Sequence, residues 1–141
     1  MGKNSLVGSW KLLSFEIRCA DGTVRYPLGE DAVGLLIYTD DGSMSVNIMK
    51  GKRPHCTSDD IGRRTAEEKV ACAESCLSYC GRYEVRGDRV VHHTEVSLFP
   101  NWVGLSQERM ARLVEETLLL STDPYLFHGT ECSSHLVWTR L

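Results

Sequence analysis

The sequence predicts an all-β fold, an antiparallel barrel of eight or nine strands with one short helix and one long loop between strands. Segments that read as short strands cover almost the whole chain, and turn signals such as Asp41-Gly42 and Gly87-Asp88 separate them. The 141 residues suffice for one domain, residues 1–141, with one sizeable core. A barrel of about eight strands either fills itself with side chains or holds one small ligand. A two-sheet sandwich is the structural alternative.

The expected strands follow one another mostly through hairpin connections. Each combines apolar and β-branched residues and ends at a turn-forming residue, which is typical of strands. We expect them at Leu6–Arg18, Thr23–Leu28, Leu35–Asp40, Ser43–Met49, Tyr79–Arg86, Arg89–Phe99, Leu105–Glu115, Thr117–Asp123 and Glu131–Leu141.

One segment departs from the strand pattern. Thr65 and Glu68 match a capping box, and the Ala- and Glu-rich run to about Leu77 favours a helix. Lys50–Arg64, before it, is polar and contains glycine and proline. Long loops in compact domains are often lids or binding loops, so we expect a lid-like loop and helix over Lys50–Leu77.

Composition excludes several classes of protein. The net charge of −3 favours neither nucleic acid nor an anionic membrane as a partner. No apolar run approaches the roughly 20 residues that a membrane-spanning helix needs. The amino-terminal MGKNSLVGSW lacks the apolar centre of a signal peptide, so a cytoplasmic location is expected.

The six cysteines are expected to be free thiols, because disulfides are rare in the cytosol. Three of them are spaced four residues apart and would share one face of a helix, as small packed side chains or, with His55 or Cys56, as a metal or redox site. The spacing does not match a standard zinc site, so no metal and no cofactor is predicted. The cysteines are Cys19, Cys56, Cys72, Cys76, Cys80 and Cys132.

The hairpin at Gly87-Asp88 shows which side chains point inward. A two-residue loop places Tyr83 opposite His92, and directly opposed residues share a sheet face. That face is apolar and continues along the second strand through Thr94, Val96 and Leu98. The opposite face is charged and carries His93.

Two other hairpins are interpreted in the same way. A Glu115-Glu116 loop places Leu113, Leu120 and, near one mouth, Arg109 and Gln107 on the inner face. A buried guanidinium needs an acceptor, which could be a ligand anion or carbonyl, a carboxylate such as Glu16, or the backbone. A two-residue Asp41-Gly42 loop places Leu35 and Ile37 inside and Tyr38 outside.

The two ends of the chain resemble those of calycin barrels. Gly8-Ser9-Trp10 and Trp138-Thr139-Arg140 are similar to a pattern in which a tryptophan packs under an arginine and plugs the barrel. Four further segments resemble the lipocalin-like domain family of bacteria and fungi: Leu6–Leu12, Gly34–Tyr38, Tyr79–Val85 and His92–Gly104. The resemblance implies a barrel that binds a small molecule. It assigns structural roles to Trp10 and Arg140.

The first functional hypothesis is a binding module for a small, mostly apolar organic molecule. Three of the expected contacts have a structural role as the alternative. His92 could be a core histidine bonded to Tyr83, Arg109 could form a structural ion pair, and Trp102 could pack without contacting a ligand. The expected ligand contacts are His92, Tyr83, Arg109, Gln107, Thr94, Val96, Leu98, Trp102, Asn101, Leu113 and Leu120.

The second hypothesis is a cofactor-independent cyclase, isomerase or dehydratase that acts on a polyketide- or terpenoid-like substrate. His92 would be the general acid or base, Tyr83 would bind a carbonyl oxygen and Arg109 would stabilise negative charge. An exposed barrel face or sheet edge would also allow a homodimer.

Overall fold

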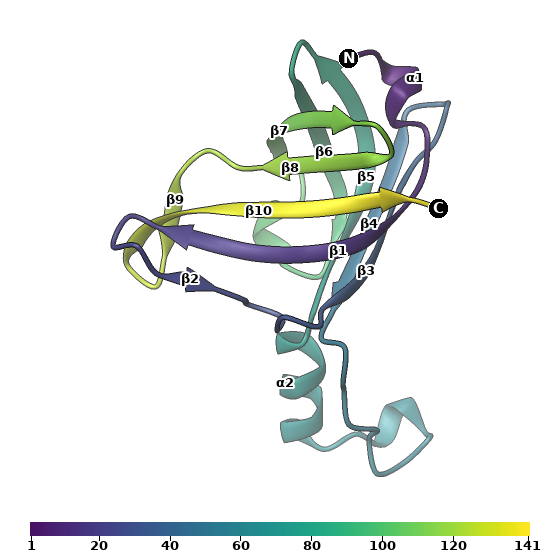
Figure 1. Cartoon of the computed structure of the whole chain (residues 1–141). Helices are drawn as coiled ribbons and strands as arrows, with labels where there is room; N and C mark the ends of the chain where they lie inside the picture. The colour runs from purple at the N-terminus through teal and green to yellow at the C-terminus, as the bar shows by residue number, and fades with distance from the viewer.

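The computed structural model describes all residues, 1–141, as a closed antiparallel barrel with two short helices (Figure 1). Closure comes from the first and last long strands, which pair with each other as well as with their sheet neighbours. The barrel strands are β1 (Gly8–Cys19), β3 (Val33–Tyr38), β4 (Ser43–Met49), β5 (Cys76–Arg86), β6 (Arg89–Ser97), β7 (Ser106–Val114), β8 (Thr117–Ser121) and β10 (Thr130–Arg140).

Two short strands extend the sheet beyond the barrel. β2 (Val24–Arg25) pairs with β1, and β9 (Tyr125–Phe127) pairs with β10. The predicted antiparallel barrel is confirmed. The short strand β9 lies in a segment where no strand was expected.

The helices are α1 (Lys3–Leu6) and α2 (Ala66–Glu74), and short 3-10 turns cover Ile61–Arg63 and Pro100–Trp102. The predicted capping box at the start of α2 is present. The helix ends before Cys76, which begins β5, so the expectation of three cysteines on one helical face is wrong. α2 buries no residue and projects from one end of the barrel rather than lying across it (Figure 1).

A tryptophan and an arginine seal the other end of the barrel. The indole Nε1 of Trp10 donates a hydrogen bond to the carbonyl of Leu6 at 2.9 Å. The guanidinium of Arg140 lies 4.2 Å from the centre of the Trp10 ring and donates to the carbonyls of Val7 and Ser5. Cation–π attraction and backbone hydrogen bonds therefore fix this plug, on which the inner core of the barrel packs.

The β3–β4 hairpin has a three-residue loop, not the expected two-residue loop. The backbone N–H of Thr39 bonds to the carbonyl of Ser43, and Gly42 takes a left-handed conformation with φ 89°. Tyr38 therefore pairs with Met44.

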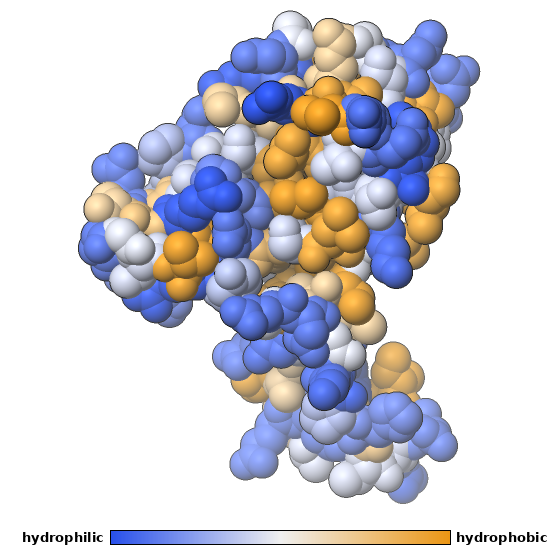
Figure 2. All heavy atoms as spheres, in the orientation of Figure 1, coloured by the Kyte–Doolittle hydropathy of each residue, from blue (hydrophilic) through white to orange (hydrophobic).

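A shift of one residue turns every β3 side chain to the other face of the sheet. Leu36 and Tyr38 are fully buried, whereas Leu35 and Ile37 are 47% and 39% exposed. The expected orientation of β3 is thus wrong. Figure 2 shows apolar side chains on the face of the barrel that β1, β10 and β3 cross in Figure 1. Leu35 and Ile37 on β3 are exposed, as is Leu13 on β1.

The β5–β6 hairpin keeps the predicted register from its turn up to the pair Gly81 and Thr94. A β-bulge then shifts the register, so that Cys80 pairs with Val96. Beyond the bulge the faces exchange, and Val96 and Leu98 are 64% and 47% exposed. The prediction that these two side chains face the interior is wrong, because two-residue alternation ends at a bulge.

The β7–β8 hairpin has the predicted pairs Leu113–Leu118 and Ala111–Leu120. β8 is short, and its pairing with β7 begins only at Met110 and Ser121. The first part of β7, before Met110, therefore has no β8 partner. This stretch of wall is open on one side.

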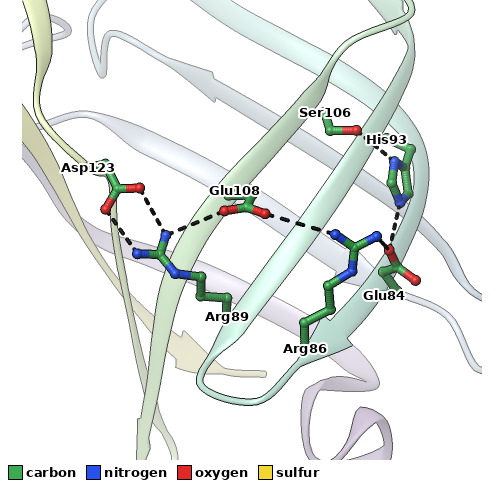
Figure 3. A network of polar contacts seen from close by, with 7 residues as sticks. All are labelled: Glu84, Arg86, Arg89, His93, Ser106, Glu108 and Asp123. Atoms are coloured by element: carbon green, nitrogen blue, oxygen red, sulfur yellow. Dashed lines mark hydrogen bonds and ion pairs between the residues drawn. The ribbon is translucent and has the colours of Figure 1, made fainter.

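An ion-pair network on the outer face reinforces this part of the wall (Figure 3). Arg89 on β6 donates two hydrogen bonds of 3.0 Å to Asp123, which follows β8. It also lies 3.6 Å from Glu108 on β7, and Arg86 joins Glu108 to Glu84. Charged groups thus tie β6 to the segment after β8, across β7.

A disulfide joins Cys19 on β1 to Cys132 on β10. The expectation of six free thiols is therefore wrong, and four cysteines are free: Cys56, Cys72, Cys76 and Cys80. Disulfides are rare in the reducing cytosol, so this bond weighs against the expected cytoplasmic location. No group of three or more metal-ligating side chains is arranged to hold an ion. Neither helix has the length and apolar character to span a membrane.

The glycine at the bulge generates the first prediction. A Cβ atom at residue 81 would lie 2.0 Å from the carbonyl oxygen of His93. Gly81→Ala should therefore lower the free energy of unfolding by about 3 kcal/mol, measured by urea denaturation. Gly2→Ala, where the added Cβ meets nothing within 4 Å, should leave it unchanged. Equal stabilities of the two variants would contradict the bulge geometry.

The disulfide generates the second prediction. It closes a loop of 113 residues, and a long loop restricts the unfolded chain strongly. Replacing Cys19 and Cys132 together by serine should lower the free energy of unfolding by about 2–4 kcal/mol. A reductant should destabilise the wild type similarly and the double variant not at all. Six alkylatable thiols in the unreduced, unfolded wild type would refute the bond.

Candidate functional site

A cavity of about 750 Å³ occupies the barrel between the Trp10 plug and the end from which α2 projects. Its wall is mostly apolar, and β1, β3, β4, β8 and β10 all contribute side chains. Glu74 and Cys76, at the junction of α2 and β5, lie at its rim. The apolar lining includes Phe15, Ile17, Leu36, Val46, Ile48, Leu77, Leu120, Phe127, Leu136 and Trp138.

A histidine held between two tyrosines forms a polar part of this cavity. The hydroxyl of Tyr38 lies 2.7 Å from Nε2 of His92, and the hydroxyl of Tyr79 lies 2.7 Å from Nδ1. The three residues come from β3, β5 and β6. All are buried, but only Tyr79 and His92 belong to the cavity wall. Tyr38 bonds to the imidazole from outside the cavity wall.

All three of these groups are neutral at physiological pH, and burial strengthens that preference. Desolvation, followed by the charges of Arg109 and His93, lowers the pKa of His92 from 6.5 to about 3. Burial raises the pKa of Tyr38 well above its usual value. Burial also raises the pKa of Tyr79, and Arg109 opposes that rise. The site therefore presents an uncharged imidazole and two protonated phenols.

Arg109 brings the positive charge of the site. Its guanidinium donates to the backbone carbonyl of Glu108 at 2.9 Å and lies 3.5 Å from the side-chain oxygen of Gln107. The predicted alternative, an ion pair with Glu16, is not formed, because Glu16 pairs with Arg18. The cavity wall thus contains a guanidinium that has no carboxylate partner.

One buried donor beside the cavity lacks a partner. Trp138 lies on β10 and lines the cavity. Its indole Nε1 is buried and makes no hydrogen bond. A buried N–H without an acceptor is costly, but this nitrogen is inaccessible to solvent, so a ligand in the cavity does not contact it.

A further polar group lies in the part of the wall formed by β9 and β10. The hydroxyls of Tyr125 and Ser134 are 2.6 Å apart, and the backbone N–H of Ser134 donates to Thr122 at 2.8 Å. All three residues line the cavity. The sequence did not predict this group, because β9 was not expected.

The structure brings some of the predicted ligand contacts together and separates others. His92, Arg109, Gln107, Trp102 and Leu120 line the cavity. The predicted contacts that do not line it are Tyr83, Thr94, Val96, Leu98, Asn101 and Leu113.

The reasons for these absences differ. The hydroxyl of Tyr83 donates to the carbonyl of Thr39, and its ring packs against the ring of Tyr38, outside the cavity wall. Thr94 is buried away from the cavity. Leu113 packs against the core, and Asn101 is exposed on the turn before Trp102.

Two residues at the centre of the site are not among the predicted ligand contacts. Tyr79 falls on the same inner face as His92 by the hairpin count, so the sequence contains the signal for it. Tyr38 falls on the outer face if the loop at Gly42 has two residues, and the third loop residue turns it inward.

The second histidine, His93, lies on the outer face as expected (Figure 3). Its Nδ1 is 2.9 Å from the hydroxyl of Ser106, and its Nε2 is 3.2 Å from Glu84. The hydrogen bond from His93, followed by the charge of Arg86, lowers the pKa of Glu84. His93 therefore belongs to the ion-pair network of the wall and not to the cavity.

Comparisons with known proteins show the family of this chain. A model of the family described as "Lipocalin-like domain" matches residues 7–141. The chain is 33% identical to the 4'-hydroxy-3'-methoxypropiophenone carrier protein ppsC of Aspergillus oryzae (strain ATCC 42149 / RIB 40), over 70% of this chain and 96% of that protein. A solved structure of an uncharacterized protein from Bacteroides eggerthii DSM 20697 covers 96% of this chain and 99% of its own, with 14% identity and a TM-score of 0.47. The chain belongs to the lipocalin-like domain family.

Proposed function

We propose that this protein binds and carries a small, largely apolar organic molecule inside its barrel. The observation that carries the proposal is the cavity of about 750 Å³, whose apolar wall is interrupted by a few convergent polar groups. This volume and this lining are typical of small-molecule sites. Apolar surface would supply the binding free energy, and the polar groups would orient the ligand.

The similarity to a named carrier supports a compact aromatic ketone, or a molecule of similar size and polarity, as the ligand. The Aspergillus oryzae relative is named as the carrier of 4'-hydroxy-3'-methoxypropiophenone. Such a molecule has an apolar ring and oxygen atoms at both ends. The cavity has polar groups around Arg109 and around Tyr125, with apolar wall in between. A role in specialised metabolism belongs to this proposal.

The enzymatic alternative has less support from the geometry. A general acid or base works best when its pKa is near the operating pH, whereas the pKa of His92 is lowered to about 3. Both ring nitrogens of His92 are engaged by tyrosines. Tyr83, the expected carbonyl-binding group, is not in the cavity wall. Binding without chemistry fits this arrangement better.

The third prediction tests binding directly. Isothermal titration calorimetry with 4'-hydroxy-3'-methoxypropiophenone should show saturable binding at one site per chain. Arg109→Ala should weaken it by about tenfold or more, because a charged hydrogen-bond donor is lost. The matched control, Arg112→Ala, removes an exposed arginine from the outer face of the same strand and should change nothing. Chemical conversion of the ketone during titration would favour the enzymatic alternative.

The fourth prediction concerns the neutral state of His92. Its pKa is about 3 in the folded chain and near 6.5 when unfolded, so the unfolded chain binds the extra proton first as pH falls. The contribution of His92 to the free energy of unfolding is fully present above pH 6.5 and is lost progressively toward pH 3. Between pH 7 and 5 the loss is about 2 kcal/mol. Urea unfolding of His92→Gln at both pH values should show a correspondingly smaller loss. His55→Gln, an exposed control, should keep the wild-type difference. Identical pH profiles of wild type and His92→Gln would contradict a buried neutral imidazole.

A further inference from the structure

The hydrogen bonds around His92 have a direction, and Tyr38 determines it. Tyr38 is fully buried, and its hydroxyl has a single partner, Nε2 of His92. If Nε2 carried the proton, the Tyr38 hydroxyl would accept that bond and its own O–H would point at no acceptor. An unpaired buried donor disfavours such an arrangement by roughly tenfold or more. Tyr38 therefore donates to Nε2.

The bond from Tyr38 also determines which group donates in the hydrogen bond between His92 and Tyr79. A neutral histidine has one N–H donor and one acceptor nitrogen, so acceptance at Nε2 places the proton on Nδ1. Nδ1 lies 2.7 Å from the hydroxyl of Tyr79, which then accepts this bond. The Tyr79 proton is left without a protein acceptor. Because Tyr79 lines the cavity, its O–H is free to point toward a bound molecule.

Another group in the same cavity wall is a donor only. The guanidinium of Arg109 donates to the backbone carbonyl of Glu108 and to Gln107, and it has no carboxylate partner. A guanidinium cannot accept a hydrogen bond. Of the carboxylates in the lining, those of Glu108 and Asp123 pair with Arg89, and Glu74 lies at the rim. The part of the wall formed by Tyr79 and Arg109 therefore presents donors.

We propose that Tyr79 and Arg109 select ligands that present a hydrogen-bond acceptor, a ketone carbonyl or an anionic oxygen, and reject ligands that present an ammonium or another pure donor. This inference rests on the proposed carrier function and specifies the chemistry of its ligand. The Tyr38–His92–Tyr79 chain acts as a positioning device, which sets the Tyr79 hydroxyl as a donor.

The first test measures the tautomer of His92 in the ligand-free protein. Two-dimensional ¹H–¹⁵N NMR of histidine side chains at neutral pH should show a protonated Nδ1 and an unprotonated Nε2. The His92→Gln spectrum assigns the signal by its loss. A proton on Nε2, or on both nitrogens, would overturn the inference, and the tautomer itself is measured on the wild-type protein.

The second test uses three probes of matched size: propiophenone, propylbenzene and 1-phenylpropan-1-amine. Calorimetry should give tightest binding for the ketone, about tenfold tighter than for the hydrocarbon, and weakest binding for the ammonium. Tyr79→Phe should reduce the advantage of the ketone by about threefold or more while leaving propylbenzene within about twofold. Tyr26→Phe, which removes the hydroxyl of an exposed tyrosine outside the cavity wall, should preserve that advantage.

The outcomes separate this inference from the proposed function. Equal affinities for propiophenone and propylbenzene in the wild type would overturn donor selection and leave the carrier function standing. A ketone advantage that Tyr79→Phe does not change would remove Tyr79 from the donor set. Failure of all three probes and of 4'-hydroxy-3'-methoxypropiophenone to bind would count against the carrier function itself.

Discussion

The pairing of β1 with β10 is the constraint on which the rest of this structure depends. It joins the first and last long strands of the chain along almost their full length, and the Cys19–Cys132 disulfide lies at one end of it. At the other end, Arg140 covers Trp10. Because a closed sheet has no free edge here, the inner face becomes a shielded volume. The disulfide and the contact of Arg140 with Trp10 therefore hold the barrel closed, in addition to the hydrogen bonds between β1 and β10.

Closure divides the interior into a solid part and a hollow part. Next to the plug, large side chains such as Trp10, Tyr38 and Leu118 fill the space. Beyond them the lining residues stand back and leave about 750 Å³. Phenols and an imidazole separate the two parts and remain uncharged, because a buried charge without a partner would be far more costly. The charged side chains of the wall are Arg109, on the first part of β7, and the carboxylates of Glu74, Glu108 and Asp123.

Two irregularities of the backbone decide which side chains meet at this boundary. The three-residue loop at Gly42 turns Tyr38 inward, and the bulge at Gly81 turns Val96 and Leu98 outward. Without the first, the imidazole would lose its partner at Nε2. Without the second, two more apolar side chains would enter the barrel and reduce the cavity. In each case one glycine permits the irregularity, through a left-handed conformation or the absence of a Cβ atom.

The sequence by itself determined the antiparallel barrel, its hairpins and the inward direction of His92, Arg109 and Leu120, because these depend on alternation near tight turns. It also determined the capping box, and the resemblance to calycin barrels implied the packing of Trp10 under Arg140. Only the tertiary structure decided the partners of His92, the disulfide, strand β9 and the exposure of Val96 and Leu98. The physical reason is register: alternation specifies a face only until a loop gains one residue or a bulge intervenes, and neither event leaves an unambiguous mark in the sequence. Contacts between strands far apart in the chain, such as Tyr38 with His92, exist only after the sheet closes.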